Sequence, residues 1–172
     1  MEDTPSLKAD TSERNVSIKS IDGATAYVDV RSFGGSAQEM DGICDTLLNG
    51  GFQTLIVDLR ENGGGGLDSA LPFGECIATD TVDAGYFVTN VWANKANRPS
   101  GPAAFNNLPI ARERTTEAFI DALKTSEGRH LVLYPRSDAY KGKVYILTSN
   151  KTASTCEPIV DALKRSGRAT IV

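Results

Sequence analysis

The sequence predicts a single α/β domain with a largely parallel inner sheet. Short apolar runs of the kind that form strands alternate along the chain with segments whose apolar residues recur at helical spacing. One run, TLIVDL at 54–59, is almost continuously apolar, which is typical of a strand covered on both faces. A chain of 172 residues, 40% of them hydrophobic and 23% charged, is long enough for one globular core.

The first half of the chain holds the clearest predicted elements. Residues 1–14 are polar and are interpreted as a leader or linker, so the domain is expected to span 15–172. Serine is a favoured helix cap and paired glycines end helices. The predicted elements are strands at 16–21 and 24–33 joined by an Asp22–Gly23 turn, a helix from Ser36 to Gly50–Gly51, a strand at 54–59, a helix at 67–78 and a strand at 85–92.

The second half begins with a segment at 93–112 that is rich in Asn, Pro, Gly and Ala and is expected to form a long surface excursion. The elements predicted after it are a helix at 115–123, strands at 130–134 and 143–148, a helix at 156–165 and a final β run at 169–172. The strand at 143–148 has the strongest β pattern of this half. A predicted helix follows this strand directly, which again favours a parallel sheet.

Composition excludes several classes of function. The net charge is −4 and the basic residues are scattered, so no nucleic-acid-binding patch is expected. No apolar run approaches the roughly 20 residues of a membrane span, and the polar start is not a signal peptide. Cys44, Cys76 and Cys156 lack metal-ligand spacing, so no metal site is expected. Cys44 and Cys76 are interpreted as small buried hydrophobes.

A run of glycines follows the predicted strand at 54–59. Residues 58–66 read DLRENGGGG where a buried strand turns toward a helix. Consecutive glycines let the backbone approach a ligand closely, and such loops bind ligands in open α/β sheets. No Lys-Ser/Thr pair follows the glycines, so this is not a phosphate-binding P-loop. The loop is either a source of N–H groups for an oxyanion or a flexible turn.

Ser154 lies at a second strand-to-helix turn, within TASTCE at 152–157. Its hydroxyl is expected near the first free N–H groups of the helix, which stabilise negative charge. Glu157 also completes a capping-box pattern, so Ser154 is either a nucleophile or a helix cap. A cap at Ser154 would put Pro158 just past the first turn at a cost, whereas a helix starting at Thr155 or later leaves Ser154 in the turn.

A serine nucleophile needs a base, and the sequence offers no convincing one. His130 is the only histidine, far from Ser154 in sequence, and a lone histidine is more often structural. Lys151 precedes the serine with no local geometry that forces contact. Lys164 lies nearly three turns along the following helix, too far to reach back.

Together, the two loop segments resemble the C-terminal processing proteases, also called tail-specific proteases. Residues 58–65 are similar to the family's D-L-R-x-N-x-G-G signature after a strand. Residues 152–157 are similar to its T-A-S-A-S-E signature between a strand and a helix. AYVDVRSF at 26–33, followed by a helix, resembles the family's first strand and helix. The resemblance covers about 15–172 and is weakest across 80–140.

The resemblance implies a ClpP/crotonase-type fold and a serine endopeptidase that hydrolyses peptide bonds through an acyl-enzyme. Ser154 aligns with the nucleophile, and the N–H groups of Gly64 and Thr155 align with the oxyanion hole. A polypeptide substrate is implied, with no cofactor and no metal. An extracytoplasmic bacterial location, periplasmic or secreted, is implied as well, and relatives often carry an upstream peptide-binding PDZ module.

The chain also departs from the family pattern. In serine–lysine members the base lies in a loop beyond the next strand, past Val172, so this chain is expected to be a core truncated at its C-terminal end and inactive by itself. Other relatives place a histidine on the first strand, but the comparable position near Asp29 has none. Cys156 replaces a usual small serine and Pro158 a usual aliphatic residue.

Two other functions remain open. A non-catalytic peptide-binding or scaffolding relative would keep the fold without the base, and a lysine shortly past Val172 would instead favour the enzyme. A ligase- or isomerase-like member of the crotonase-type fold would use the oxyanion hole without a nucleophile. The serine turn argues against this last function.

Overall fold

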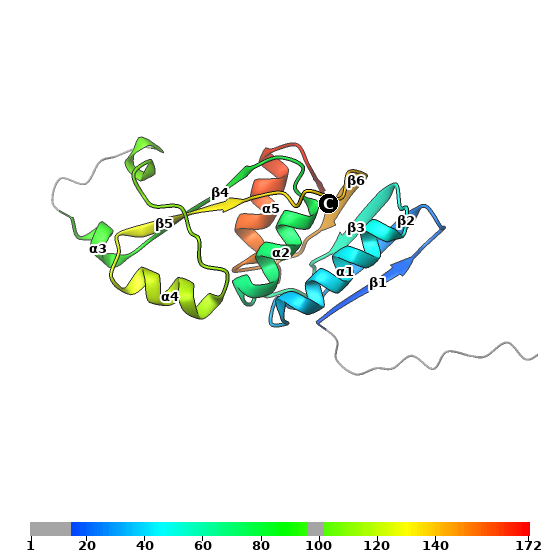
Figure 1. Cartoon of the computed structure of the whole chain (residues 1–172), viewed down its shortest axis with the longest axis horizontal. Coiled ribbons are helices and arrows are strands. Elements are labelled where there is room, and N and C mark those ends of the chain that lie inside the picture. Colours follow the sequence, from blue (N-terminus) through cyan, green and yellow to red (C-terminus); the bar gives the residue numbers. More distant parts are fainter. Residues whose placement is uncertain (1–14, 96–101) are drawn as a thin grey trace, which may run out of the picture.

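The computed structural model describes residues 15–95 and 102–172 and has a five-stranded sheet at its centre (Figure 1). In spatial order the strands are β1 (Val16–Ser20), β2 (Thr25–Val30), β3 (Thr54–Asp58), β6 (Lys143–Leu147) and β7 (Thr170–Ile171). β1 is antiparallel to β2, and the other three neighbouring pairs are parallel. The predicted α/β class with a largely parallel sheet is therefore confirmed.

Three helices pack against this sheet and build the core. They are α1 (Ala37–Asn49), α2 (Leu67–Ile77) and α5 (Cys156–Arg165). Ser36 caps α1 as predicted, because its hydroxyl accepts the Glu39 N–H at 3.2 Å. The strands supply fully buried Val28, Leu55 and Ile146 to the core. Burying each such side chain stabilises the fold by about 1.5–3 kcal/mol.

The opposite face of the sheet is more open than the sequence predicts. Burial alternates along β3, so Leu55 and Val57 are buried while Ile56 is only partly covered. The expectation that 54–59 is covered on both faces therefore does not hold in the described residues. On the open face Ile56 lies between Tyr27 of β2 and Tyr145 of β6, its register partners. These aromatic neighbours give Ile56 lateral packing without a covering layer.

A two-stranded antiparallel ribbon projects away from the main sheet (Figure 1). It consists of β4 (Val82–Val88) and β5 (Gly128–Leu133). The short helices α3 (Asn90–Ala93) and η1 (Pro102–Phe105) and helix α4 (Thr116–Lys124) lie toward its far end. Tyr86 stacks on Phe105 with ring centroids 5.2 Å apart, which attaches η1 to the ribbon.

The sequence placed some of these elements inaccurately. The strand expected at 85–92 begins earlier and ends at Val88, and residues 91–92 belong to α3. The excursion expected at 93–112 contains η1, and its residues 96–101 lie outside the described residues. The leader expected at 1–14 also lies outside them, so the boundary at residue 15 stays a prediction.

Candidate active site

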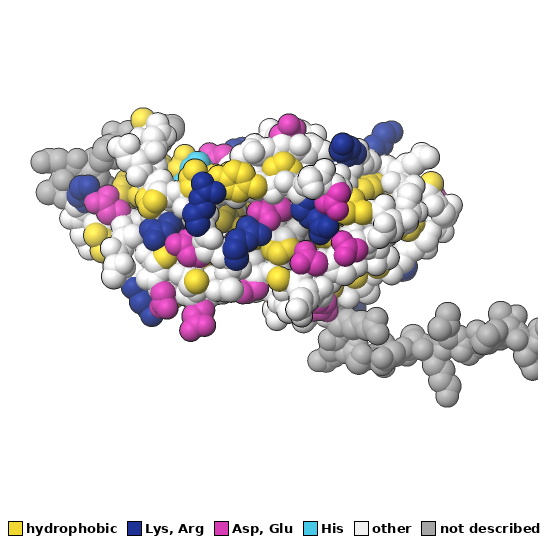
Figure 2. All heavy atoms as spheres, in the orientation of Figure 1, with side chains coloured by type: hydrophobic (Ala, Val, Ile, Leu, Met, Phe, Trp, Pro, Cys, Tyr) yellow, Lys and Arg dark blue, Asp and Glu magenta, His cyan; other side chains and the backbone are white. Residues whose placement is uncertain are grey.

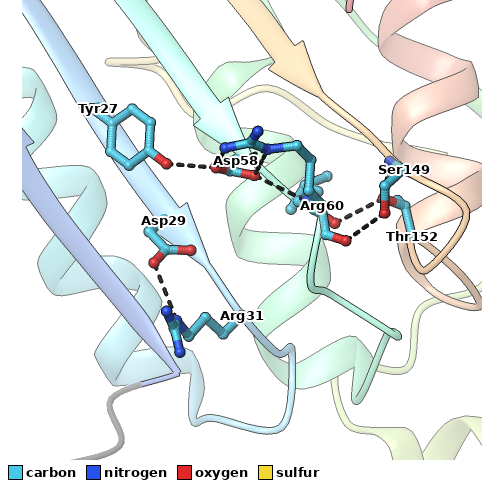
Figure 3. Close-up of polar contacts among 8 residues, drawn as sticks. Tyr27, Asp29, Arg31, Asp58, Arg60, Ser149 and Thr152 are labelled. Carbon is cyan, nitrogen blue, oxygen red and sulfur yellow. Dashed lines mark hydrogen bonds and ion pairs between the residues drawn. The ribbon is translucent and has the colours of Figure 1, made fainter. Parts of the chain in front are cut away.

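The two signature loops meet because they follow neighbouring parallel strands. β3 and β6 pair in parallel, so the segments after Asp58 and Leu147 leave the sheet at the same edge. Two hydroxyls join them, as Figure 3 shows. Thr152 Oγ1 donates to the Leu59 carbonyl at 2.7 Å, and Ser149 Oγ donates to the Arg60 carbonyl at 2.5 Å. The turn before α5 is thereby fastened to the glycine loop.

Asp58 fixes the backbone where β3 ends. Its carboxylate accepts hydrogen bonds from the Arg60 guanidinium, the shortest at 2.6 Å, and one from the Tyr27 hydroxyl at 2.5 Å (Figure 3). It also accepts the Arg60 N–H at 3.0 Å. These bonds, from Arg60 foremost, hold the pKa of Asp58 well below its usual range although the residue is buried. The charged Asp58 carboxylate therefore fixes the backbone conformation at the start of the glycine loop.

Ser154 adopts a backbone conformation that L-residues rarely use. Its φ is +60°, and no other non-glycine residue in the described ranges has a positive φ. This left-handed conformation costs about 1–2 kcal/mol, and such strain is often found at functional sites. The conformation is held because the Ser154 N–H donates to Glu157 Oε2 at 2.7 Å.

The Ser154 side chain does not cap the helix. α5 begins at Cys156, and Thr155 occupies the capping position without a side-chain cap bond. Within the described residues the Ser154 hydroxyl has no hydrogen-bond partner, whereas the Glu157 carboxylate bonds back to the turn as in half of a capping box. Of the two interpretations of this serine, the geometry therefore argues against the helix cap.

Gly64 lies directly against Ser154. A Cβ atom at Gly64 would stand 2.6 Å from the Ser154 Cβ and 3.0 Å from the Ala153 carbonyl oxygen, and the Gly64 φ is +104°. Only glycine therefore fits at this position without displacing the serine turn. The structure thus brings together two residues that the sequence assigned to one site from distant segments.

Asn62 organises the contact between the loops, and sequence reasoning missed it. Its side chain is fully buried, and Oδ1 accepts the Gly64 N–H at 2.8 Å. Its carbonyl accepts the Ala153 N–H at 3.2 Å and faces the Cys156 thiol at 3.5 Å. Burial raises the pKa of that thiol to about 11, so Cys156 is protonated there at neutral pH. An Asn two residues before a glycine is an Asx-turn signal that could have indicated this role.

The N–H groups around Ser154 differ in availability. That of Gly64 is engaged by Asn62. The N–H groups of Gly65 and Thr155 have no hydrogen-bond acceptor among the described residues. An unsatisfied N–H beside a serine hydroxyl is the kind of donor that an oxyanion requires.

A groove of about 420 Å³ opens beside the serine. One wall comes from β4 and the other from the turn before α5 and its first residues, and the lining taken as a whole is more apolar than polar. The lining residues are Ala84, Gly85, Tyr86, Phe87, Ser154, Thr155, Glu157 and Pro158. β4 pairs with β5 along one edge only, so within the described residues its other edge is without a strand partner. The groove thus combines the Ser154 hydroxyl with a mostly apolar lining, and one of its walls is a strand with an unpaired edge.

None of the basic residues considered from the sequence lines this groove. His130 stacks on Tyr86 with ring centroids 4.4 Å apart, and its Nε2 lies 3.2 Å from Asp83 Oδ1. Lys151 Nζ pairs with Glu61 at 2.6 Å. Lys164 lies in the last turn of α5. In the described part of the chain, no lysine or histidine is hydrogen-bonded to Ser154.

Residues 24–172 match the sequence model of peptidase family S41. The chain belongs to peptidase family S41. Membership of this family confirms the resemblance to C-terminal processing proteases, and the family is one of peptidases, which are hydrolases. A search of curated proteins finds no match.

Solved structures share the fold of this S41 chain. The photosystem II D1 C-terminal processing protease superposes with a TM-score of 0.62 at 16% identity, over 94% of this chain and 36% of that chain. Mature CPAF superposes with a TM-score of 0.56 at 11% identity, over 86% of this chain and 36% of that chain. A lipoprotein from Streptococcus agalactiae superposes with a TM-score of 0.50 at 16% identity, over 92% of this chain and 48% of that chain. Identities this low establish the fold alone, and the S41 chain spans less than half of each of these proteins.

Two further observations bear on the expected partners of the S41 chain. Across 15–95 and 102–172, no three His, Cys, Asp or Glu side chains gather as a metal site would require. Among the helices in those ranges, none is both long and apolar enough to cross a bilayer.

Proposed function

We propose that this chain is the catalytic core of a serine endopeptidase with Ser154 as its nucleophile. The observation that carries the proposal is the placement of Ser154: a strained φ of +60°, a hydroxyl without a hydrogen-bond partner in the described residues, and direct contact with Gly64 beside a groove. In this proposal the Ser154 oxygen attacks a peptide carbonyl. The tetrahedral intermediate then expels the amine, and water hydrolyses the acyl-enzyme.

The oxyanion would be stabilised by backbone N–H groups, and we assign this role to Thr155 and Gly64. The Thr155 N–H has no acceptor among the described residues and precedes the positive end of α5. The Gly64 N–H donates to Asn62 Oδ1, so it would have to be shared or released when the oxyanion forms. Losing one such donor typically lowers turnover roughly 10²–10³-fold.

The proton from Ser154 would pass to a base outside the described residues. The family resemblance points to a lysine, whose pKa would be lowered by burial. On this proposal residues 1–172 alone hydrolyse peptides poorly or not at all. A location outside the cytoplasm and an upstream peptide-binding module belong to the same proposal, and a lipoprotein among the similar structures is compatible with that location.

The proposed substrate is an extended polypeptide. The unpaired edge of β4 offers backbone groups to which a peptide strand could add, and the apolar groove could receive one of its side chains. A peptide bound in this way would have its scissile carbonyl beside the Ser154 hydroxyl.

Peptide hydrolysis tests the proposal. Wild-type and Ser154→Ala proteins would be compared, as residues 1–172 and as the longer protein if the gene continues past Val172. Activity that requires Ser154 is expected in the longer protein, with little in residues 1–172. Activity of the longer protein that survives Ser154→Ala would refute the assignment.

A non-catalytic peptide-binding relative is the second candidate. It is favoured by one observation, that no lysine or histidine of the described residues is hydrogen-bonded to Ser154. Such a protein would bind peptides equally well with Ser154→Ala and would show no turnover in any form.

A further inference from the structure

A second pocket, of about 360 Å³, lies at the edge of the sheet opposite to the serine turn. It is lined by Lys141, Gly142 and Lys143 at the start of β6, and by Gly167 and Arg168 in the loop between α5 and β7. The serine turn and the glycine loop instead follow the carboxyl ends of β6 and β3. This pocket therefore has no part in the proposed peptide hydrolysis.

The charged residues of this pocket are all basic. Lys141, Lys143 and Arg168 line it, and no Asp or Glu does. Among the described residues, the ammonium groups of the two lysines have no ion-pair or hydrogen-bond partner. The whole chain has a net charge of −4, and Figure 2 shows acidic and basic side chains intermixed on the face that carries α1 and α2. The concentration of three cations in one pocket differs from that mixture.

Arg168 is held in place without a carboxylate. Its Nε donates to the Ile77 carbonyl at 2.7 Å, Nη1 to the Gly142 carbonyl at 2.8 Å and Nη2 to the Tyr140 carbonyl at 2.6 Å. A guanidinium has five N–H donors, so two remain for another acceptor. Burial lowers the pKa of the Arg168 guanidinium. The three carbonyls orient the side chain but leave its positive charge without a counter-charge.

Other hydrogen-bond donors around Gly142 are also unpaired. Tyr140 is buried, and its hydroxyl has no hydrogen-bond partner in the described residues. This hydroxyl lies against Gly142, where an added Cβ atom would clash with it. Burial raises the pKa of Tyr140, so the hydroxyl stays protonated at neutral pH and can donate. The backbone N–H groups of Lys141 and Gly142 have no acceptor in the described ranges either.

Structural roles explain some of these residues singly. Lysines near the edge of a sheet are often simply solvated, and Arg168 joins the end of α2 to the loop before β6. These roles do not explain why the buried Tyr140 hydroxyl is unpaired or why no carboxylate accompanies Arg168. An anion with several oxygen atoms would neutralise the cations and accept hydrogen bonds from the unpaired donors.

We propose that this pocket binds a phosphate group, either as inorganic phosphate or as the phosphomonoester of a small molecule. The two spare N–H groups of Arg168 and the ammonium groups of Lys141 and Lys143 donate to its oxygens. A phosphomonoester carries about 1.5–2 negative charges at neutral pH, which suits a pocket with three cations. The proposal does not depend on the catalytic role of Ser154.

The test is an NMR titration of the ¹⁵N-labelled chain of residues 1–172 with sodium phosphate or with glycerol 3-phosphate. Sodium chloride at the same ionic strength is the reference. The amide signals of Gly142, Gly167 and Arg168 should shift and saturate with phosphate but not with chloride, while those of Gly64 and Thr155 stay in place. Tighter binding of glycerol 3-phosphate would identify a phosphomonoester as the ligand, and equal or weaker binding would identify inorganic phosphate.

Exposed lysines supply the variants, because replacing them leaves the core intact. The double variant Lys141→Gln with Lys143→Gln should weaken the phosphate affinity roughly 10-fold. Lys95→Gln with Lys124→Gln is the matched control, because it removes the same charge from exposed lysines that do not line the pocket.

Two results would overturn the proposal. One is the absence of saturable shifts at Gly142, Gly167 and Arg168 in the wild-type chain, including the case in which only Gly64 and Thr155 respond. The other is an equal affinity for phosphate in the pocket variant and in the control variant. The spectra themselves show whether each variant is folded, so a loss of binding cannot be confused with unfolding.

Discussion

At Ser154 the backbone adopts a conformation that L-residues avoid, and Gly64 leaves the space in which the serine turn can sit. Neither property is visible in the residue types alone. A serine before a helix is usually a cap, and a glycine run is often only a flexible turn. The strain at Ser154 and the contact with Gly64 make the site interpretation physically testable without any assay of activity.

Relief of strain gives the first prediction. Ser154→Gly should raise the free energy of unfolding by about 1 kcal/mol relative to Ser154→Ala, because glycine adopts a φ of +60° without a Cβ penalty. Thr155→Gly is the matched control. Its φ is −60°, so glycine there should only destabilise. Urea unfolding gives the free energy of unfolding of the three variants. Equal values for Ser154→Gly and Ser154→Ala would contradict the strain at Ser154.

Close contact gives the second prediction. Gly64→Ala should destabilise the fold by more than about 2 kcal/mol, because it adds a steric clash with Ser154 to the cost of a positive φ. Gly85→Ala is the matched control, because Gly85 has a φ of +99°, close to that of Gly64, and a Cβ atom there would meet nothing within 4 Å. It should therefore lose only about 1–2 kcal/mol. The difference between the two variants in urea unfolding isolates the contact. Equal losses of stability in the two variants would contradict the close contact between Gly64 and Ser154.

At the scale of elements, the end of β3 is held by the charge of Asp58. Asp58→Asn should cost about 1–3 kcal/mol at neutral pH, because Arg60 and Tyr27 lose their charged partner. The pKa of Asp58 is lowered by folding, so its contribution is complete above the ordinary value of 3.8 and is lost as the pH falls below it. The stability gap between wild type and variant should therefore stay constant down to about pH 5 and shrink in more acidic solution.

Denaturant unfolding across this pH range checks the Asp58 prediction. Asp29→Asn is the control, because Asp29 pairs with an exposed Arg31 and such pairs contribute roughly 0–1 kcal/mol. A gap for Asp58→Asn that widens as the pH falls would show that the carboxylate is not stabilised in the folded state.

Local patterns predicted the elements well and their surroundings less well. The helix at 156–165 and the strand after Asp22–Gly23 were found because capping, turn and periodicity signals are local. The covering of β3 was predicted wrongly, because an apolar run does not reveal whether Tyr27 and Tyr145 flank it on an open face. The strand at 85–92 was misplaced because Val91 continues the β pattern into α3.

The site was only partly predictable for a related reason. Ser154, Thr155 and Gly64 could be selected because they lie in two signature segments. Their ties through Asn62 and the groove wall from β4 could not, because those depend on contacts between segments far apart in sequence. The roles of Ser154, Thr155 and Gly64 remain proposals that the geometry supports.

At the scale of the whole molecule, the ribbon and α5 together form the groove. In the active form of the protein, Phe87→Ala should lower kcat/KM for peptides with apolar side chains by roughly 10-fold or more, because the groove loses an apolar wall. Phe119→Ala is the matched control. It removes the same Phe87–Phe119 ring contact, at 5.1 Å, but does not line the groove. Equal effects of both variants would indicate loss of stability rather than of substrate contact.

The most direct test of the account is the position of a covalent adduct. The active form of the protein would be treated with a fluorophosphonate, which modifies activated serines, and the modified residue would be located by peptide mass spectrometry. The account predicts one adduct on Ser154 and no labelling of Ser154→Ala. An adduct on another residue, or labelling that persists in Ser154→Ala, would contradict it.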